Sequence, residues 1–377
     1  MMHPRWFPEE FPSFGRKSRF RKIFHLRDYR SPHECIREMQ RVGGRPLRVL
    51  PHLGMVIGEF YQEYGAQSFH GHPDIAFWEP DIKVTITDPF LGAIADRTAS
   101  LPWGIQRVEA PKAWNYTQGR GIKVAVIDTG IANDHPALKG NYKGGVNILS
   151  QMFTPYDYNG HGTHVAGTIA GRANDMGLVG VAPRVHLYAV KAFNRKGSAN
   201  LSDLLSAINW CIENKMDVIN MSFGMAKVSD TLRQAIVTAY RKGIVMIAAA
   251  GNQGTNNVEF PARFKETIGV TSISKDGKLS SFSNVGPGVD IAAPGDKITS
   301  SWLNGTTREM SGTSMAVPHV VGTVALLLYL RPDLTPVHVR QILTYSSVGV
   351  AGETKVRSIH AYRSVQTLAR LMGRLIP

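Results

Sequence analysis

Short apolar segments recur along the last three quarters of the chain and alternate with amphipathic ones. Residues 122–127 and 244–250 are almost continuously apolar and no longer than ordinary strands. This pattern is typical of strands that are buried on both faces of a parallel sheet. Four further segments have the same character: residues 185–190, 218–221, 268–273 and 289–293.

Helical patterns lie between these segments. Residues 200–203 have the composition of a helix start, and apolar residues follow at helical spacing from Leu204 to Ile212. Thr335 and Pro336 form a good N-cap and first-turn pair for a later helix. Strands separated by helices predict an α/β fold in which a parallel sheet has helices on both faces. In such sheets, functional sites form beyond the carboxyl ends of the strands.

The N-terminal quarter has a different texture. Residues 1–45 are rich in Pro, Arg and aromatic residues without a clear period, which predicts a loose basic extension. Residues 46–87 predict a small α+β unit, and the stretch Ile82 to Thr87 alternates apolar and polar positions like a half-buried strand. Residues 88–100 are expected to be a linker before a main domain at 101–377.

The composition excludes several classes of protein. The chain has 377 residues, of which 43% are hydrophobic and 19% charged, so it has enough apolar material for a large core and does not have the composition of a disordered chain. The longest apolar stretch, residues 320–330, is well short of the roughly 20 residues of a membrane-spanning helix. Cys35 and Cys211 cannot form a disulfide framework, and Cys211 is expected to be a small core side chain.

The net charge of +14 is unevenly distributed. Residues 1–50 carry +7, residues 51–100 carry −5 and residues 101–377 carry +12. Nucleic-acid binding is one interpretation of a basic chain. No zinc-finger spacing or RNA-binding aromatic motif accompanies the charge, so we expect a soluble basic protein without a nucleic-acid or membrane partner.

The first residues do not resemble an export signal, because Phe and Trp are scattered among Pro, Glu and Arg. An ordinary signal has an apolar run of about 7–15 residues after its positive end. We therefore expect a cytoplasmic protein. Extracellular placement, by unconventional export or from a wrongly assigned start, is the alternative.

Three short motifs place polar side chains at strand ends or helix starts. Asp128 ends a buried strand, where a carboxylate could equally be a cap or a turn residue. His161 stands between glycines, and its alternative is a metal-binding pair with His164. That pair lacks the four-residue spacing and the glutamate of zincins. Ser314 follows a glycine turn into an apolar helix, and alone it would be an ordinary cap.

Together, these three residues have the chemistry of an activated serine. A serine hydroxyl needs an adjacent base, an imidazole titrates near neutrality, and a buried carboxylate holds the imidazole in the correct tautomer. The chain order Asp128, His161, Ser314 accounts for all three motifs. The nucleophile elbow of α/β-hydrolases, which residues 312–316 nearly fit, has the order Ser, acid, His. That alternative would recruit a later histidine: His319, His338 or His360.

A fourth motif carries Asn252 on a glycine-rich turn after the strand at 244–250. An amide there could donate to a developing oxyanion, and the alternative is a plain turn. Through these four motifs residues 101–377 resemble the subtilase family of serine proteases. The resemblance implies a subtilisin-like three-layer fold and an endopeptidase that forms an acyl-enzyme and needs no cofactor for its chemistry. It assigns Asp128, His161 and Ser314 as the triad, and it assigns Asn252 with the Ser314 backbone N–H as the oxyanion hole.

The same resemblance implies how a protein or peptide substrate is held. Ser222, Phe223 and Gly224 would line the S1 pocket, and Gly197 and Ser198, within residues 196–199, would form the opposite rail. Both segments would bind an extended peptide by strand addition. The glycines and serines around this cleft suggest a broad specificity for apolar side chains, and we expect a monomer.

Residues 46–87 resemble, more weakly, the inhibitory propeptide of that family. The resemblance implies a self-processing zymogen in which this segment is a folding template and an intramolecular inhibitor until it is cut between Thr87 and Ser100. The charges agree, because an acidic segment would dock on a basic domain.

The family's calcium site is only partly present. The resemblance places it at a loop with Asn174, but Ala137 and Ala99 stand where the family has an aspartate and a glutamine. A hard cation needs several oxygen ligands, so we expect no tight calcium site unless Asp134 or Asp175 substitutes.

Two other classes of function remain open. A lipase or esterase would need a lipid-binding cap and the other motif order. A binding protein built on a retired protease fold would lack a triad member, and none is missing here.

Overall fold

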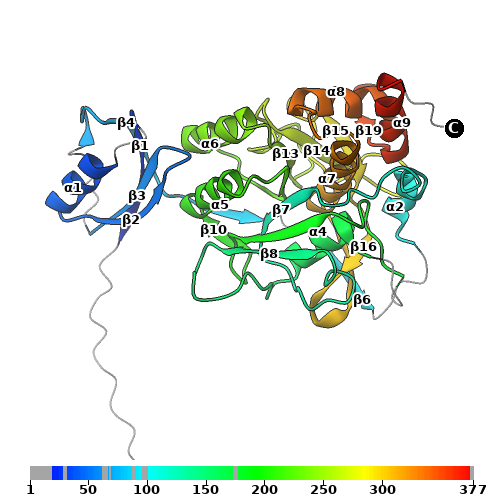
Figure 1. Cartoon of the computed structure of the whole chain (residues 1–377), viewed down its shortest axis with the longest axis horizontal. Helices are drawn as coiled ribbons and strands as arrows, with labels where there is room; N and C mark the ends of the chain where they lie inside the picture. Colours follow the sequence, from blue (N-terminus) through cyan, green and yellow to red (C-terminus); the bar gives the residue numbers. More distant parts are fainter. Residues whose placement is uncertain are drawn as a thin grey trace, which may run out of the picture. The chain divides into compact units, whose positions relative to one another are not determined.

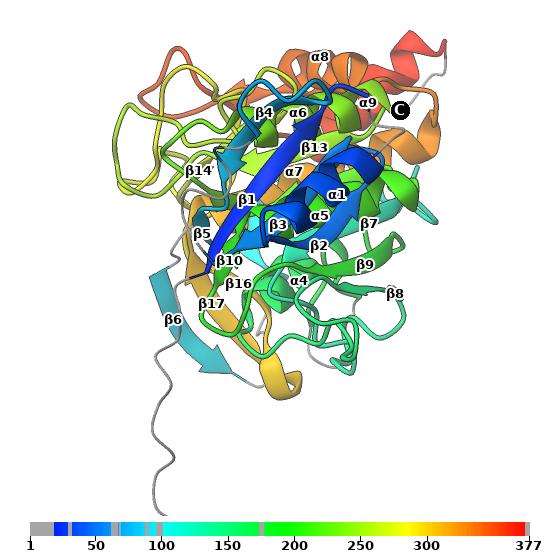
Figure 2. The same ribbon diagram turned by 90° about the vertical axis from the view of Figure 1, so that its left-hand side faces the viewer.

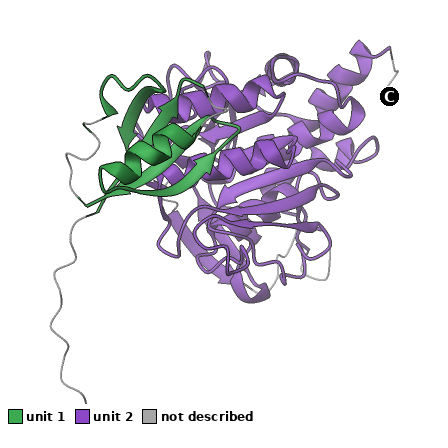
Figure 3. Cartoon of the chain, turned by 60° about the vertical axis from the view of Figure 1, so that its left-hand side comes forward, with its two compact units in different colours: residues 1–81 green, residues 82–377 purple. Residues whose placement is uncertain are grey.

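The computed structural model describes residues 19–28, 32–61, 67, 69–86, 90–95, 101–172 and 177–373. The chain divides into two compact units, Met1–Asp81 and Ile82–Pro377 (Figure 3). Each unit has its own sheet and its own buried apolar cluster.

Unit 1 is a four-stranded antiparallel sheet, in the order β2-β3-β1-β4, with one helix packed against β2 and β3. Phe24, Phe60 and Phe69 form the aromatic centre of its core. Helix α1 contributes Cys35 and Met39 to that core. The elements are β1 (Phe20–Leu26), α1 (His33–Arg41), β2 (Arg45–Leu50), β3 (Met55–Phe60) and β4 (Ile75–Pro80).

The expectation of a loose extension over residues 1–45 is wrong for its described part. Strand β1 lies between β3 and β4, and five consecutive residues from Lys22 to Leu26 are buried. A strand buried on both faces has no alternation of apolar and polar positions, so the sequence shows no period there. Residues 1–18 lie outside the described residues.

Unit 2 is built on a nine-stranded sheet in the order β18-β19-β15-β14-β13-β11-β7-β9-β8. All pairs are parallel except β18 with β19. Six of the strands are those predicted from the apolar segments. The bounds are β7 (Lys123–Asp128), β8 (Tyr142–Asn147), β9 (His186–Lys191), β11 (Val218–Met221), β13 (Val245–Ala249), β14 (Ile268–Ile273), β15 (Ile291–Pro294), β18 (Val348–Gly349) and β19 (Arg357–Ser358).

Helices cover both faces of this sheet (Figure 1). Helices α4 and α7 pack together on one face, and α5 and α6 pack together on the other. Both predicted helix starts are present, because Asn200 and Asp203 form a capping box and Thr335 accepts from the His338 backbone. The helices are α2 (Trp103–Arg107), α3 (Ala110–Ala113), α4 (His161–Ala170), α5 (Leu201–Glu213), α6 (Asp230–Arg241), α7 (Thr313–Leu330), α8 (Pro336–Ser346) and α9 (Ala361–Leu371), with a 3-10 turn at Leu303–Gly305.

Helix α7 is the central helix of unit 2. It lies along β11, β13, β14 and β15. Within the described part of the chain it alone is long and apolar enough to cross a membrane, but 89% of that stretch is buried inside the protein. Burial of this kind is what a core helix shows, so its composition follows from packing.

Two three-stranded sheets lie at the edges of unit 2. The first has the order β10-β5-β12, and the second has the order β16-β17-β6, with β6 beside β17 (Figure 2). The strands are β5 (Lys83–Ile86), β6 (Phe90–Ala95), β10 (Ser198–Asn200), β12 (Phe223–Gly224), β16 (Ile298–Ser301) and β17 (Thr307–Ser311).

The strands of these small sheets show that two predicted domain boundaries, those of the 46–87 unit and of the 88–100 linker, differ from the observed ones. The predicted strand near residue 84 exists, with Val84 and Ile86 buried, but it belongs to unit 2 and not to the small unit expected at 46–87. The expected linker at 88–100 contains β6, which gains backbone pairing with β17. Residues 87–89 and 96–100 lie outside the described residues.

Candidate active site

The four predicted functional residues meet at one edge of the main sheet. Strand β7 ends in Asp128, and Asn252 follows the end of β13, which is separated from β7 by β11. His161 and Ser314 come from the first turns of α4 and α7, the two helices that pack together on one face. Adjacent parallel strands present their carboxyl ends at the same edge, which is why residues far apart in sequence converge here.

Asp128 and His161 form a buried, bifurcated pair. Nδ1 of His161 lies 2.8 Å from Oδ1 and 2.9 Å from Oδ2 of Asp128. The backbone N–H of Thr129 also donates to Oδ1, at 2.7 Å. With Nδ1 donating to the carboxylate, the lone pair of the neutral ring is on Nε2, on the side away from Asp128.

The turn that carries His161 is held by another buried carboxylate, that of Asp157. Its Oδ1 accepts from the backbone N–H groups of Asn159 (2.8 Å) and Gly160 (3.0 Å). Its Oδ2 accepts from the N–H and the hydroxyl of Thr163, at 3.0 and 2.7 Å. Gly160 has φ +106°, a conformation that favours glycine. Sequence reasoning missed Asp157, although an Asp two residues before an Asn-Gly pair and a helix start is a turn signal.

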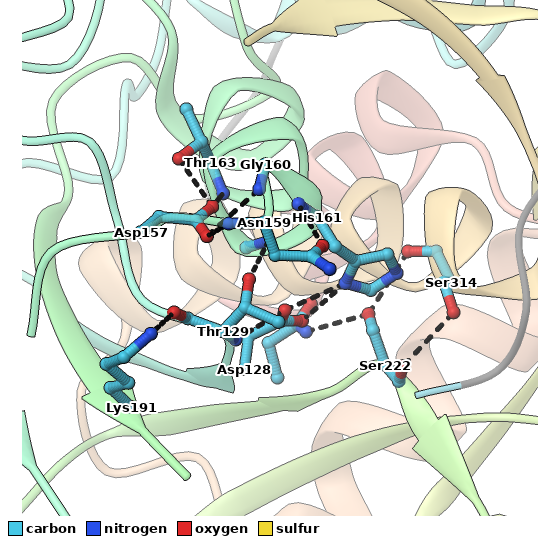
Figure 4. Close-up of polar contacts among 12 residues, drawn as sticks. Asp128, Thr129, Asp157, Asn159, Gly160, His161, Thr163, Lys191, Ser222 and Ser314 are labelled. Carbon is cyan, nitrogen blue, oxygen red and sulfur yellow. Dashed lines mark hydrogen bonds and ion pairs between the residues drawn. The ribbon is translucent and has the colours of Figure 1, made fainter. Parts of the chain in front are cut away.

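Lys191 was also missed, and it lies behind the Asp128 strand end. This lysine at the end of β9 is buried and donates through Nζ to the carbonyl of Thr129 (Figure 4). Burial lowers the pKa of Lys191, while the carboxylates of Asp157 and Asp128 act in the opposite direction. Thr129 is therefore held at its N–H by Asp128 and at its carbonyl by Lys191.

Ser314 lies on the side of the His161 ring that is away from Asp128 (Figure 4). Its hydroxyl donates to the carbonyl of Ser222 at 3.1 Å, and the hydroxyl of Ser222 donates back to the carbonyl of Ser314 at 3.1 Å. Asp128, His161 and Ser314 are 0%, 1% and 0% exposed. All three are thus enclosed by protein.

Asn252 is oriented by the residue before Ser314. Its Oδ1 accepts from the backbone N–H of Thr313 at 2.9 Å and from the Thr313 hydroxyl at 2.8 Å. These two bonds decide which end of the amide is oxygen, so Nδ2 is on the other side. The donor group of Asn252 and the N-terminus of α7 therefore belong to one small region beside Ser314.

The segments predicted to bind substrate enclose a strand of the chain itself. Strand β5 lies between β10 and β12 and is antiparallel to both. Thr85 is level with Ser198 on one side and Gly224 on the other, and Ile86 is level with Phe223. The Ile86 N–H donates to the carbonyl of Gly197 at 2.9 Å.

Two of the other histidines named as alternatives, His164 and His319, form hydrogen bonds elsewhere. His164 points to β16 and β17, where Nε2 donates to the carbonyls of Ile298 (2.9 Å) and Arg308 (3.0 Å). Burial lowers the pKa of His164 to about 3, so it is a neutral structural side chain. His319 bonds through Nδ1 to the carbonyl of Met315, one turn earlier on α7. The pairing of His161 with His164 as metal ligands is therefore wrong.

The described residues do not supply the expected calcium ligands. Ala137 is buried and offers no side-chain oxygen, and Asp134 accepts from the hydroxyl of Tyr156. Asn174, Asp175 and Ala99 lie outside the described residues. Within the described residues no group of three or more His, Cys, Asp or Glu could hold a metal ion.

Comparison with known proteins agrees with this geometry. The model of the subtilase family matches residues 119–370. M-protease from Shouchella clausii is 40% identical over 279 residues, which cover 74% of this chain and 70% of the relative. Subtilisin Savinase from Lederbergia lenta is 42% identical over 253 residues, covering 66% and 93%. Subtilisin NAT from Bacillus subtilis subsp. natto is 44% identical over 251 residues, covering 65% of each chain.

Proposed function

The chain belongs to the subtilase family and is a subtilisin-like serine endopeptidase, and we propose that Asp128, His161 and Ser314 are its catalytic residues. The observation that carries this assignment is the buried bond between His161 and Asp128, with Ser314 on the other side of the ring. This is the arrangement that a serine nucleophile requires, because one ring nitrogen is held while the other can take the hydroxyl proton.

The reaction follows from these positions. Ser314 Oγ attacks the scissile carbonyl carbon while Nε2 of His161 takes the hydroxyl proton, and Asp128 stabilises the imidazolium. His161 then gives the proton to the leaving amine as the C–N bond breaks. Water, activated by the same imidazole, hydrolyses the acyl-enzyme and regenerates the Ser314 hydroxyl. Hydrolysis by this route needs no cofactor.

The tetrahedral oxyanion is stabilised by two donors in this proposal. One is the Asn252 amide, which Thr313 orients through the two bonds to Oδ1. The other is the backbone N–H of Ser314 in the first turn of α7, where the helix dipole also favours negative charge. Donors that are fixed before the reaction do not have to reorganise as the charge forms.

We further propose that the chain is made as a zymogen and that β5 is the inhibitory segment. Strand β5 occupies the position between Gly197–Ser198 and Phe223–Gly224 where an extended substrate would add as a strand. The burial of Ser314 and His161 supports this latent state, because both side chains are enclosed by protein in the structure that has β5 in this position.

The pairing of β5 with β12, and of β6 with β17, limits the range of peptide bonds at which the chain is expected to be cut. Ile86 is level with Phe223, directly beside Ser222, whose carbonyl accepts from Ser314. Phe90 is level with Ser311, three residues before the nucleophile. The bond that is cut should therefore lie between Thr87 and Phe90, which is a smaller window than Thr87 to Ser100.

N-terminal sequencing of the purified full chain and its Ser314→Ala variant tests this function. The wild type should acquire a new N-terminus between residues 88 and 90 and should hydrolyse casein. The variant should keep its original N-terminus and hydrolyse no casein. Equal processing or equal casein hydrolysis by both proteins would contradict the proposal, and hydrolysis of esters but not peptides by the wild type would favour a lipase or esterase.

A further inference from the structure

A short segment joins the two loops that flank Ser314 and Asn252. After β12, Met225 exchanges both backbone hydrogen bonds with Phe260, at 2.8 and 2.9 Å. The preceding residue, Glu259, donates through its N–H to the carbonyl of Ala250, which follows β13, at 3.0 Å. Glu259 therefore spans the space between the end of β12 and the end of β13.

The carboxylate of Glu259 lies against glycines on both sides of that space. A Cβ added at Gly224 would overlap Oε2 of Glu259. A Cβ added at Gly251 would lie 3.1 Å from Cδ of the same side chain. Gly224 and Gly251 have no side chains, and the Glu259 carboxylate lies in the space that side chains at those two positions would occupy.

Among the described residues, Glu259 has a neutral hydrogen-bond partner and forms no ion pair with a cation. Burial raises the pKa of Glu259, and a side-chain hydrogen bond from Gln253 opposes that shift. Oε1 of Gln253 accepts from Nδ2 of Asn284 at 2.6 Å, which leaves the amide nitrogen of Gln253 to face Glu259. No ion pair joins Glu259 to a lysine or arginine within the residues described. A partly buried carboxylate with only a neutral partner still attracts a cation.

The register of β5 shows which substrate residue would reach this carboxylate. Ile86 is level with Phe223, so the next residue of an extended peptide in this register comes level with Ser222. Ser222 is bonded to Ser314, so this next residue is the one whose carbonyl is attacked. Gly224 is two residues after Ser222, and Gly251 immediately precedes Asn252, so the Glu259 carboxylate lies between the strand that pairs with β5 and the proposed oxyanion donor.

We propose that Glu259 selects, among separate peptide substrates, those that have lysine or arginine immediately before the scissile bond. The self-cut is intramolecular and does not depend on this selection, because the chain already holds its own segment in place. The inference rests on the proposed function, because it takes Ser314 as the nucleophile. A cationic side chain entering between Gly224 and Gly251 forms a charge-assisted hydrogen bond with Glu259, and an arginine forms two. This differs from the broad apolar specificity expected from the glycines and serines around the cleft.

Four fluorogenic peptides that differ only in the residue before the scissile bond test the inference: lysine, arginine, methionine and phenylalanine. Methionine is the matched uncharged control for the length of lysine. The full chain, Glu259→Gln, Glu259→Asp and Glu213→Gln are compared after self-processing, with active sites counted by a fluorophosphonate. Glu213 is exposed at the end of α5, so its variant removes the same charge away from the site.

We expect kcat/KM of the wild type for lysine and arginine to exceed that for methionine by about 10- to 100-fold, the range of a hydrogen bond to a charged group. Glu259→Gln should reduce this ratio to near unity while the methionine and phenylalanine peptides are still cleaved. Glu259→Asp should retain part of the ratio, and Glu213→Gln all of it.

Two results would overturn the inference and leave the protease function intact. One is a wild type that cleaves the methionine peptide as well as the lysine peptide. The other is an unchanged ratio in Glu259→Gln. Failure of the wild type to cleave any of the four peptides would overturn the proposed function, and this inference with it.

Discussion

Two carboxylates near the nucleophile differ in how fully the protein's own donors occupy their oxygens. Asp128 is fully buried and bonded to the His161 ring and to a backbone N–H. Glu259 is partly buried, bonded to the neutral amide of Gln253 and placed between two glycines. A carboxylate whose oxygens are occupied by donors of its own protein is suited to orienting the imidazole, whereas a partly buried carboxylate held by one amide is suited to recognising a charged ligand.

The largest expected effect comes from removing the His161 ring, the partner of Asp128. His161→Ala should lower kcat by about a millionfold, the loss seen when a subtilisin loses its triad histidine. His338→Ala is the matched control, because His338 is exposed at the start of α8 and would be required only by the α/β-hydrolase alternative. The rate of peptide hydrolysis per folded molecule is measured for both variants. A larger loss in His338→Ala than in His161→Ala would favour the α/β-hydrolase alternative.

The next effect concerns Asn252, the proposed oxyanion donor in the region beside Ser314. Asn252→Ala should lower kcat by about 10²–10³ with little change in KM, as when an oxyanion-hole donor is removed from a subtilisin. Asn256→Ala, an exposed amide in the same loop, should leave both constants unchanged. Steady-state kinetics on one peptide decides this, and a loss confined to KM would mean that Asn252 only binds substrate.

The role proposed for Glu259 can be tested by the pH dependence of substrate selection. Burial raises the pKa of Glu259, so its carboxyl becomes neutral at a higher pH than an exposed glutamate. The ratio of lysine to methionine cleavage should therefore be high above that pKa and fall toward unity as pH falls through it. Any effect of pH on the catalytic steps that both peptides share cancels in the ratio.

The matched variant for this pH profile is Glu259→Gln, whose ratio should be low and independent of pH. A wild-type ratio that does not change with pH, measured over the range where both peptides are cleaved, would show that Glu259 does not carry the charge that the substrate recognises.

The smallest expected effect concerns the turn that holds His161. Asp157→Asn replaces an acceptor of four hydrogen bonds by a group with donors on one side. The free energy of unfolding should fall by about 1–3 kcal/mol, measured by denaturant unfolding in the Ser314→Ala background to prevent self-digestion. Asp276→Asn, an exposed control, should change it little, and equal stability of the two variants would contradict the role given to Asp157.

Much of unit 2 could be predicted from the sequence because its signals are local. The buried strands are continuous apolar segments, and Asp128, His161, Asn252 and Ser314 each follow a glycine turn or a strand end. The rails around β5 could be placed only through the family resemblance, because nothing in their composition distinguishes them from ordinary loops.

The features that sequence reasoning missed depend on distant contacts. Strand β1 lacks a visible period because it lies between two other strands. Glu259 reaches the substrate position only through the pairing of Met225 with Phe260, which no local pattern reveals. Asp157 has a local turn signal, but its bonds to the start of α4 appear only in the folded chain.

The most direct measurement for the central assignment is peptide mapping after reaction of the processed protein with a fluorophosphonate. The account predicts one adduct, on Ser314, that forms rapidly in the wild type, very slowly in His161→Ala and not at all in Ser314→Ala. An adduct on a different serine, or an equal labelling rate in His161→Ala, would contradict it.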